Sequence, residues 1–128
     1  MQISQNKCIR FCLNLGCRES ISLDKFREIN WLPVEERVNQ SICTLIYKYL
    51  HNNVPEYIED IFNLKIRKHN TRNPNVLMRP FCPTNMGQKA ISYQGPKLWE
   101  GIPIDIKNKL NIASFKHDFK NRFLKNLI

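Results

Sequence analysis

Long apolar runs are missing from this sequence. The longest apolar-rich stretch without a charged residue or a proline is SICTLIY at 41–47. Because a membrane-spanning helix needs about 20 predominantly apolar residues, no transmembrane helix is expected. The N-terminal segment carries Lys7 and Arg10 among its apolar residues and has no small-residue cleavage site, so a secretory signal is not expected either. The sequence therefore predicts an intracellular protein, nuclear or cytoplasmic, with no membrane partner.

Acidic residues are scarce in the second half of the chain. Residues 1–64 contain seven Lys/Arg and eight Asp/Glu, a balance of −1, whereas residues 65–128 contain thirteen Lys/Arg and three Asp/Glu, a balance of +10. The length of 128 residues and the hydrophobic content of 42% suit a single domain over 1–128, with a near-neutral half and a basic half. Such a basic half favours a polyanionic partner, either RNA or DNA or an anionic surface.

Residues suited to catalysis or metal binding are also few. Polymerases hold their metal ions with convergent carboxylates, but the sequence has no Asp-Asp pair and only four isolated aspartates. None of the five cysteines belongs to a C-x-x-C pair, and their odd number favours reduced, mostly buried thiols. Cys8 and Cys12 with His51 or His69 are a zinc alternative, although the i, i+4 spacing of the cysteines fits one buried helix face equally well. We therefore expect neither an enzyme nor a bound metal or cofactor.

Helical periodicity dominates the patterns that are present. The clearest helix begins at Pro33 and runs to about His51, with apolar residues at 3.6-residue spacing. The expected core takes Val38, Ile42, Leu45 and Tyr49 from it, with Trp31 and Trp99 largely buried. Other helices are expected over Gln2–Leu15 ending at Gly16, over Leu23–Ile29 after a Ser22 cap, over 55–62, and over Phe115–Leu127 after a Ser114 cap.

Two short extended segments flank the turn-like stretch TNMG. They are VLMRPFCP at 76–83 and QKAISY at 88–93, and they predict a two-stranded β-hairpin. The expected fold is therefore mainly α, a small helical domain with one short two-stranded β-hairpin.

Glycine is rare, yet two of the four glycines stand in GPKLWEGIPIDI at 95–106. Gly95 suits an N-cap, Pro96 the first helical position and Gly101 a left-handed cap, while Pro103 starts a second turn. The stretch contains no nucleophile, histidine or paired carboxylate. We interpret it as an architectural corner that buries Trp99.

Basic residues gather in two places of the second half. The segment at 63–75 has no periodicity and resembles a loop; its candidate phosphate contacts are Lys65, Arg67, Lys68 and Arg72. In the last helix, phenylalanines at i, i+4 and i+8 form an apolar stripe, and the candidate contacts beside it are Lys116, Lys120, Arg122 and Lys125. If the stripe docks on the core, the basic flank faces solvent, where phosphates need only charge and reach. The alternative for both sets is a merely solvated surface.

Five segments, taken in order, carry a resemblance to a known family. They are QNKCIRFCLNL beginning at Gln5, INWLPVEER at Ile29–Arg37, YKYLHNNVPEY at Tyr47–Tyr57, PKLWEGIP at Pro96–Pro103 and SFKHDFK at Ser114–Lys120. Together they resemble the C-terminal region of LINE-type, jockey-like non-LTR retrotransposon reverse transcriptases over nearly the whole chain. The chain departs from that family at Met86-Gly87, where an aromatic-Gly pair is usual, and at Gln94-Gly95, where small residues are commoner.

The resemblance implies a region that follows the polymerase core of an RNA-directed DNA polymerase. The polymerase palm would lie outside this chain. The chain itself would be a non-catalytic fragment that binds the RNA or DNA backbone of a template or target without sequence preference. The alternative is a structural or protein-interaction domain whose positive charge only aids solubility.

Overall fold

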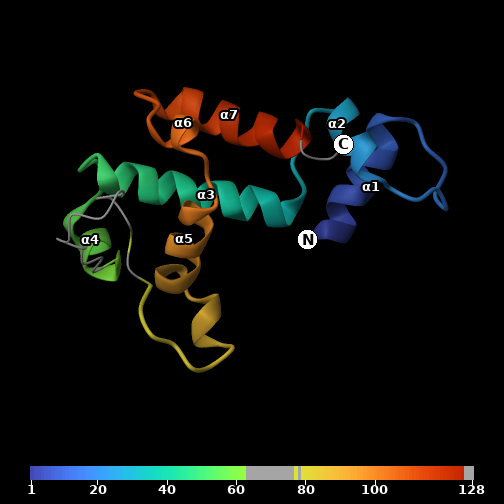
Figure 1. The fold of residues 1–128 in the computed structure, drawn as a ribbon. Helices are drawn as coiled ribbons and strands as arrows, with labels where there is room; N and C mark the ends of the chain where they lie inside the picture. Colours follow the sequence, from blue (N-terminus) through green and yellow to red (C-terminus); the bar gives the residue numbers. More distant parts are fainter. Residues whose placement is uncertain (63–76, 78, 126–128) are drawn as a thin grey trace.

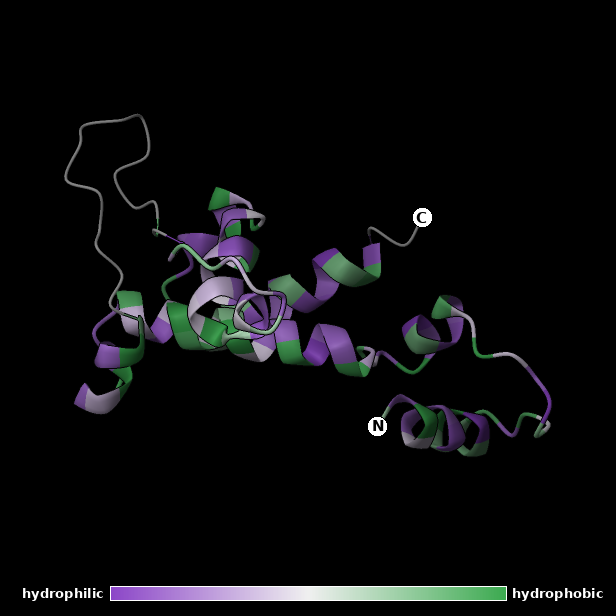
Figure 2. Cartoon of the chain, turned by 90° about the horizontal axis from the view of Figure 1, so that it is seen from below, coloured by the Kyte–Doolittle hydropathy of each residue, from purple (hydrophilic) through white to green (hydrophobic). Residues whose placement is uncertain are grey.

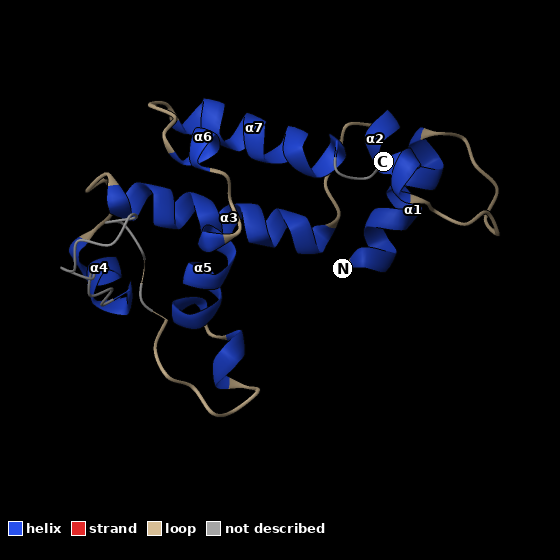
Figure 3. Ribbon diagram, in the orientation of Figure 1, coloured by secondary structure: helices blue, strands red, loops and turns tan. Residues whose placement is uncertain are grey.

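The computed structural model describes residues 1–62, 77 and 79–125, and every regular element in this part of the chain is helical (Figures 1 and 3). The elements in chain order are α1 (Gln2–Cys12), α2 (Leu23–Glu28), α3 (Val34–Leu50), α4 (Glu56–Phe62), the 3₁₀ helix η1 (Gly87–Lys89), α5 (Ile91–Glu100), α6 (Ile104–Lys107) and α7 (Ile112–Lys125). The prediction of a mainly α fold is confirmed. No helix among these is long and apolar enough to cross a membrane.

Asparagines, rather than glycines, end the first three helices. Asn14, Asn30 and Asn52 have φ values of 53°, 59° and 51°, a left-handed conformation that asparagine tolerates better than most residues. In each case the next amide donates to a carbonyl five residues back, and the pairs are Leu15 to Arg10, Trp31 to Phe26 and Asn53 to Lys48. These bonds satisfy carbonyls that the helix end would leave free. The expected glycine ends are wrong, since α1 ends before Gly16 and Gly101 has a φ of −71°.

The helix α3 is the centre of the fold, and α5 and α7 pack against it (Figure 1). Cys43, Ile46 and Tyr47 of α3 are buried in the main hydrophobic core, together with residues of α4, α5, α6 and α7. Burial raises the pKa of the Cys43 thiol to about 12, so this side chain is a neutral packing group at physiological pH.

The face that α3 turns to the core differs from the predicted one. Val38 is 52% exposed, so its expected place in the core is wrong. Ile42, Leu45 and Tyr49 are only partly buried and pack against the edge of the core. The reason is that α5 and α7, which both pack on α3, bury Cys43, Ile46 and Tyr47 in the core with Trp99 and Phe115.

The predicted β-hairpin is wrong, because its second segment is helical. Residues 88 and 89 belong to η1, residues 91–93 are the start of α5, and residues 79–83 contain no strand. Ile91, Gly95, Leu98 and Ile102 recur at helical spacing, so the apolar pattern runs straight through the Gly-Pro pair. The pair therefore lies inside α5 and does not start it.

Gly95 and Pro96 are buried where α5 crosses α3. A Cβ atom built on Gly95 would lie 2.8 Å from Ile46 Cδ1 and 3.6 Å from Phe62 Cε1, so glycine is what allows the close approach. Pro96 removes one hydrogen bond of the helix, and its buried ring contributes apolar contact in return. Trp99, one turn further on, is 5% exposed, which confirms that the stretch buries its tryptophan.

The substitution Gly95→Val is expected to lower the free energy of unfolding by about 1–3 kcal/mol, as overpacked core positions do. Ile46 is fully buried, so it has little room to move away from the added methyl groups. The matched control is Gly16→Val, where an added Cβ meets nothing within 4 Å. Urea denaturation of both variants measures the difference. If the two variants are equally stable, the close packing of α5 on α3 at Gly95 is wrong.

The last helix, α7, begins two residues before the expected Ser114 cap. Asn111 Oδ1 accepts a hydrogen bond from the Ala113 amide at 2.9 Å, so Asn111 is the residue that caps the helix. Phe115 is fully buried, whereas Phe119 and Phe123 are half-buried. The phenylalanine stripe thus docks α7 mainly through its first ring.

The helices α1 and α2 lie beyond the N-terminal end of α3, away from the crossing of α3 and α5 (Figures 1 and 2). Gln5 Nε2 donates to the Leu32 carbonyl at 2.7 Å, and the Arg27 guanidinium donates to the Leu124 carbonyl of α7 at 2.8 and 3.0 Å. The first bond joins α1 to the segment before α3, and the other two join α2 to the last turn of α7. Trp31, at the entry to α3, is 38% exposed, so its expected burial is wrong.

Candidate nucleic-acid interface

Only four of the eight predicted phosphate contacts lie in the part of the chain that the structure describes. Lys65, Arg67, Lys68 and Arg72 lie outside the described residues. The four cations of α7 are described, but they do not form one surface. Arg122 Nη1 donates to the Gly101 carbonyl at 2.8 Å and so joins α7 to the end of α5, while Lys125 is exposed in the last turn of the helix.

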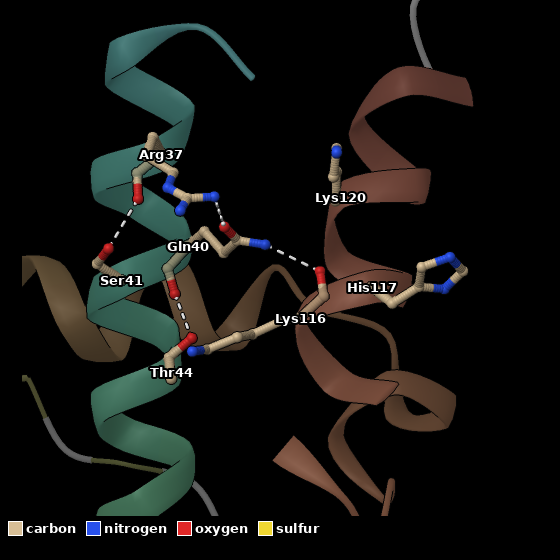
Figure 4. Close-up of a pocket in the computed structure, with 7 residues that line it drawn as sticks. All are labelled: Arg37, Gln40, Ser41, Thr44, Lys116, His117 and Lys120. Atoms are coloured by element: carbon tan, nitrogen blue, oxygen red, sulfur yellow. Dashed lines mark hydrogen bonds between the residues drawn. The ribbon is translucent and has the colours of Figure 1, made fainter. Parts of the chain in front are cut away.

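Lys116 and Lys120 lie together, on the side of α7 that faces α3. They line an open groove of about 320 Å³ between the two helices (Figure 4). The α3 side of this groove consists of Arg37, Gln40, Ser41 and Thr44. In Figure 4 the Lys116 side chain extends across the groove toward Thr44, and His117 points away from it. We call this site the α3–α7 groove.

Buried Gln40 connects the two walls of the α3–α7 groove. It is 6% exposed, its Nε2 donates to the Lys116 carbonyl at 2.9 Å, and its Oε1 accepts from Arg37 Nη1 at 3.3 Å (Figure 4). Thr44 Oγ1 donates to the Gln40 carbonyl at 2.7 Å, and Ser41 Oγ donates to the Arg37 carbonyl at 3.0 Å. Because Gln40 satisfies its own buried polar atoms in this way, it fixes the distance between the helices and holds the guanidinium over the groove.

The α3–α7 groove is electropositive. Among the described residues, Arg37, Lys116 and Lys120 line it, and no carboxylate does. Within the described part of the chain, none of these three cations takes part in an ion pair. Asp118, the acid of α7, is paired instead with Lys109 at 2.9 Å, and the hydrogen bond from Lys109 holds its pKa below the usual range. An arginine and two lysines without acidic partners suit a phosphate oxygen, which accepts short charge-assisted hydrogen bonds.

Sequence reasoning identified Lys116 and Lys120 but missed Arg37. The missed signal is a polar stripe on α3, at positions 37, 41, 44 and 48, whose spacing of four, three and four places them on one helix face. The charge balance by halves hides Arg37, because it stands beside Glu35 and Glu36 in the near-neutral half.

The cysteines do not form the expected buried helix face. Cys8, Cys12 and Cys17 are exposed, Cys82 is half-buried and only Cys43 is buried, so the prediction of mostly buried thiols is wrong. No group of three His, Cys, Asp or Glu side chains among residues 1–62, 77 and 79–125 could hold a metal ion.

No protein-family model matches the chain, and no curated protein or solved structure is significantly similar to it.

Proposed function

We propose that this chain is a non-catalytic nucleic-acid-binding module that binds the phosphate backbone of RNA or DNA without sequence preference. The observation that carries the proposal is the α3–α7 groove, where three cations face one opening and none of them pairs with an acid of the described residues. The balance of +10 over residues 65–128 adds long-range attraction for a polyanion. Backbone contacts of this kind need charge and reach but read no bases.

The origin that fits this proposal is the C-terminal region of a LINE-type, jockey-like reverse transcriptase. The five ordered segments of the sequence that resemble this family support it. Two of these segments contribute to the groove, since Ile29–Arg37 ends at Arg37 and Ser114–Lys120 contains both lysines. A region after the polymerase core would hold the template or target while the chemistry occurs on another part of the parent enzyme.

A protein-interaction role is the second candidate, and the exposed face of α1 favours it. Ile3 and Phe11 of α1 are 74% and 88% exposed, and exposed apolar side chains that gather in one patch mark contact surfaces. In that case the positive charge serves solubility, and binding to RNA is absent or independent of salt.

The test of the proposed function is RNA binding by variants of the basic and near-neutral halves. Replacing Lys65, Arg67, Lys68 and Arg72 with Gln is expected to lower affinity for a single-stranded RNA. It should also flatten the log–log salt dependence by about 0.7 per lost contact. The control replaces Arg10 and Arg18 with Gln; the Arg10 guanidinium is already bonded to the Glu19 carbonyl, so a smaller effect is expected. Fluorescence anisotropy at several salt concentrations measures both. Unchanged binding in the first variant would show that these four residues are not phosphate contacts. A dominant effect of Arg10 and Arg18 would show that the basic half is not the contact surface.

A further inference from the structure

A second hollow lies further along the same side of α3 and α7. It has a volume of about 580 Å³ and is lined by Lys48 and His51 at the end of α3, by Asn52 and Asn53 after it, and by Asn111 at the start of α7. No carboxylate of residues 1–62, 77 or 79–125 lines it. It combines one cation, one imidazole and several amide groups, which is a different chemistry from that of the α3–α7 groove.

The two hollows follow each other along one seam between the helices. Arg37, Ser41, Thr44 and Lys48 lie on one face of α3, and the first three line the groove whereas Lys48 lines the second hollow. On α7 the order is reversed, since Ile112 lines the second hollow and Lys120 the groove. From residue 37 to residue 48 the seam is about 16 Å long at 1.5 Å per helical residue. This length accommodates about five stacked nucleotides of one strand, at about 3.4 Å each.

His51 is held as a rigid aromatic surface at the far end of the seam. Its ring stacks on Tyr47, with 4.1 Å between centroids and 25° between planes. Tyr47 in turn stacks on buried Phe115 at 4.8 Å, and Phe115 on Trp99 at 5.9 Å. Although His51 itself is exposed, it is therefore the outer member of a row of rings anchored in the core.

The hydrogen bond of His51 defines what its ring can offer. Nδ1 lies 2.8 Å from the Tyr47 carbonyl, and a carbonyl only accepts, so Nδ1 carries the proton. In the neutral ring Nε2 is then an acceptor. A nucleobase can stack on such a ring and also donate a hydrogen bond nearby, and the side-chain amides of Asn52, Asn53 and Asn111 both donate and accept.

From this arrangement we infer that the seam binds a single-stranded nucleic acid. Its phosphates lie along Arg37, Lys116 and Lys120, and one unpaired base stacks on His51. The inference rests on the proposed function and makes it more specific, because a base held inside a duplex cannot leave its stack to lie on a protein ring without a cost in pairing and stacking. Since every base has a stacking face, the site tolerates any sequence.

The test compares His51→Ala with the parent chain in anisotropy titrations against a single-stranded RNA of about ten nucleotides, a length well above the five that the seam accommodates. The expected result is a loss of affinity of about tenfold, as for one stacked base, with no change in the salt dependence. His51→Phe keeps an aromatic ring and is expected to bind like the parent. The matched control is Tyr57→Ala, which removes an aromatic side chain that is 69% exposed on α4, away from the seam.

The outcomes separate this inference from the proposed function. If the parent binds RNA with a steep salt dependence but His51→Ala binds equally well, the base site is wrong and the backbone-binding function stands. If His51→Phe loses as much as His51→Ala, stacking is not the interaction. Equal affinity of the parent for a duplex of the same length would contradict the preference for a single strand. Absence of RNA binding by the parent would overturn both.

Discussion

Replacing Trp99 with Ala is expected to lower the free energy of unfolding by about 3–5 kcal/mol, the usual cost of truncating a buried aromatic side chain. The indole is 5% exposed and has two neighbours that lose their contact with it. Phe115 stacks on it at 5.9 Å between ring centroids. Lys107 Nζ lies 5.6 Å from the centre of the indole ring, and burial lowers the pKa of this lysine. The substitution therefore leaves a cavity at the point where α5, α6 and α7 meet.

Trp31→Ala is the matched control, because it removes the same side chain from a site that is 38% exposed. We expect a clearly smaller loss of stability for it. Urea denaturation followed by circular dichroism measures both variants, and the slope of the transition shows whether unfolding remains cooperative. If Trp99→Ala is as stable as the parent, the corner at 95–106 does not anchor the core.

The second large effect is expected from removing the three cations of the α3–α7 groove. The triple variant Arg37→Gln, Lys116→Gln, Lys120→Gln should bind single-stranded RNA about a thousandfold more weakly at low salt, roughly tenfold for each lost contact. Its log–log salt dependence should be flatter than that of the parent by about 2. The fold should remain intact, since Gln40, not the cations, connects the two helices.

A variant with the same change of charge elsewhere is the control for this prediction. Lys7, Lys89 and Lys97 are exposed on α1, η1 and α5, and none of them lines the groove. Replacing these three with Gln lowers the net charge by the same amount. If both triple variants lose affinity equally, the affinity for RNA depends only on the net charge and the groove has no special role.

The existence and type of most helices could be predicted from the sequence. Pro33, Pro55 and Pro103 mark the starts of α3, α4 and α6, and the segment HNNVP marks the end of α3. The buried face of α3 was harder to predict, because its centre carries Cys43, Thr44 and Tyr47. These residues are less apolar than Val38 or Leu45, so a pattern of hydrophobicity points to the wrong side. Only the packing of both α5 and α7 on α3 determines which face is covered.

The prediction of a β-hairpin failed for a related reason. A proline normally marks the first turn of a helix, so Pro96 predicts a start there, and the preceding residues then look extended. Inside the folded chain the cost of Pro96 within α5 is offset by its burial against α3, which the sequence alone does not reveal. The apolar spacing from Ile91 to Ile102 was the signal that could have shown the longer helix.

The candidate site was half predictable. Lys116 and Lys120 follow from the basic final helix, but Arg37 and His51 belong to the near-neutral half and reach the same seam only because α7 packs along α3. Arg122 shows the converse, since its charge suggested a phosphate contact whereas its guanidinium bonds the Gly101 carbonyl. Composition locates the charge, and the packing of the two helices decides which charges act together.

The most direct test of nucleic-acid binding by this chain is the affinity of the unmodified protein for a single-stranded RNA, measured from roughly 50 to 200 mM salt. Three phosphate contacts in the groove predict a straight log–log dependence with a slope of about −2, and contacts elsewhere in the basic half make it steeper. Absent binding at the lowest salt, or an affinity that does not change with salt, would contradict the proposed function.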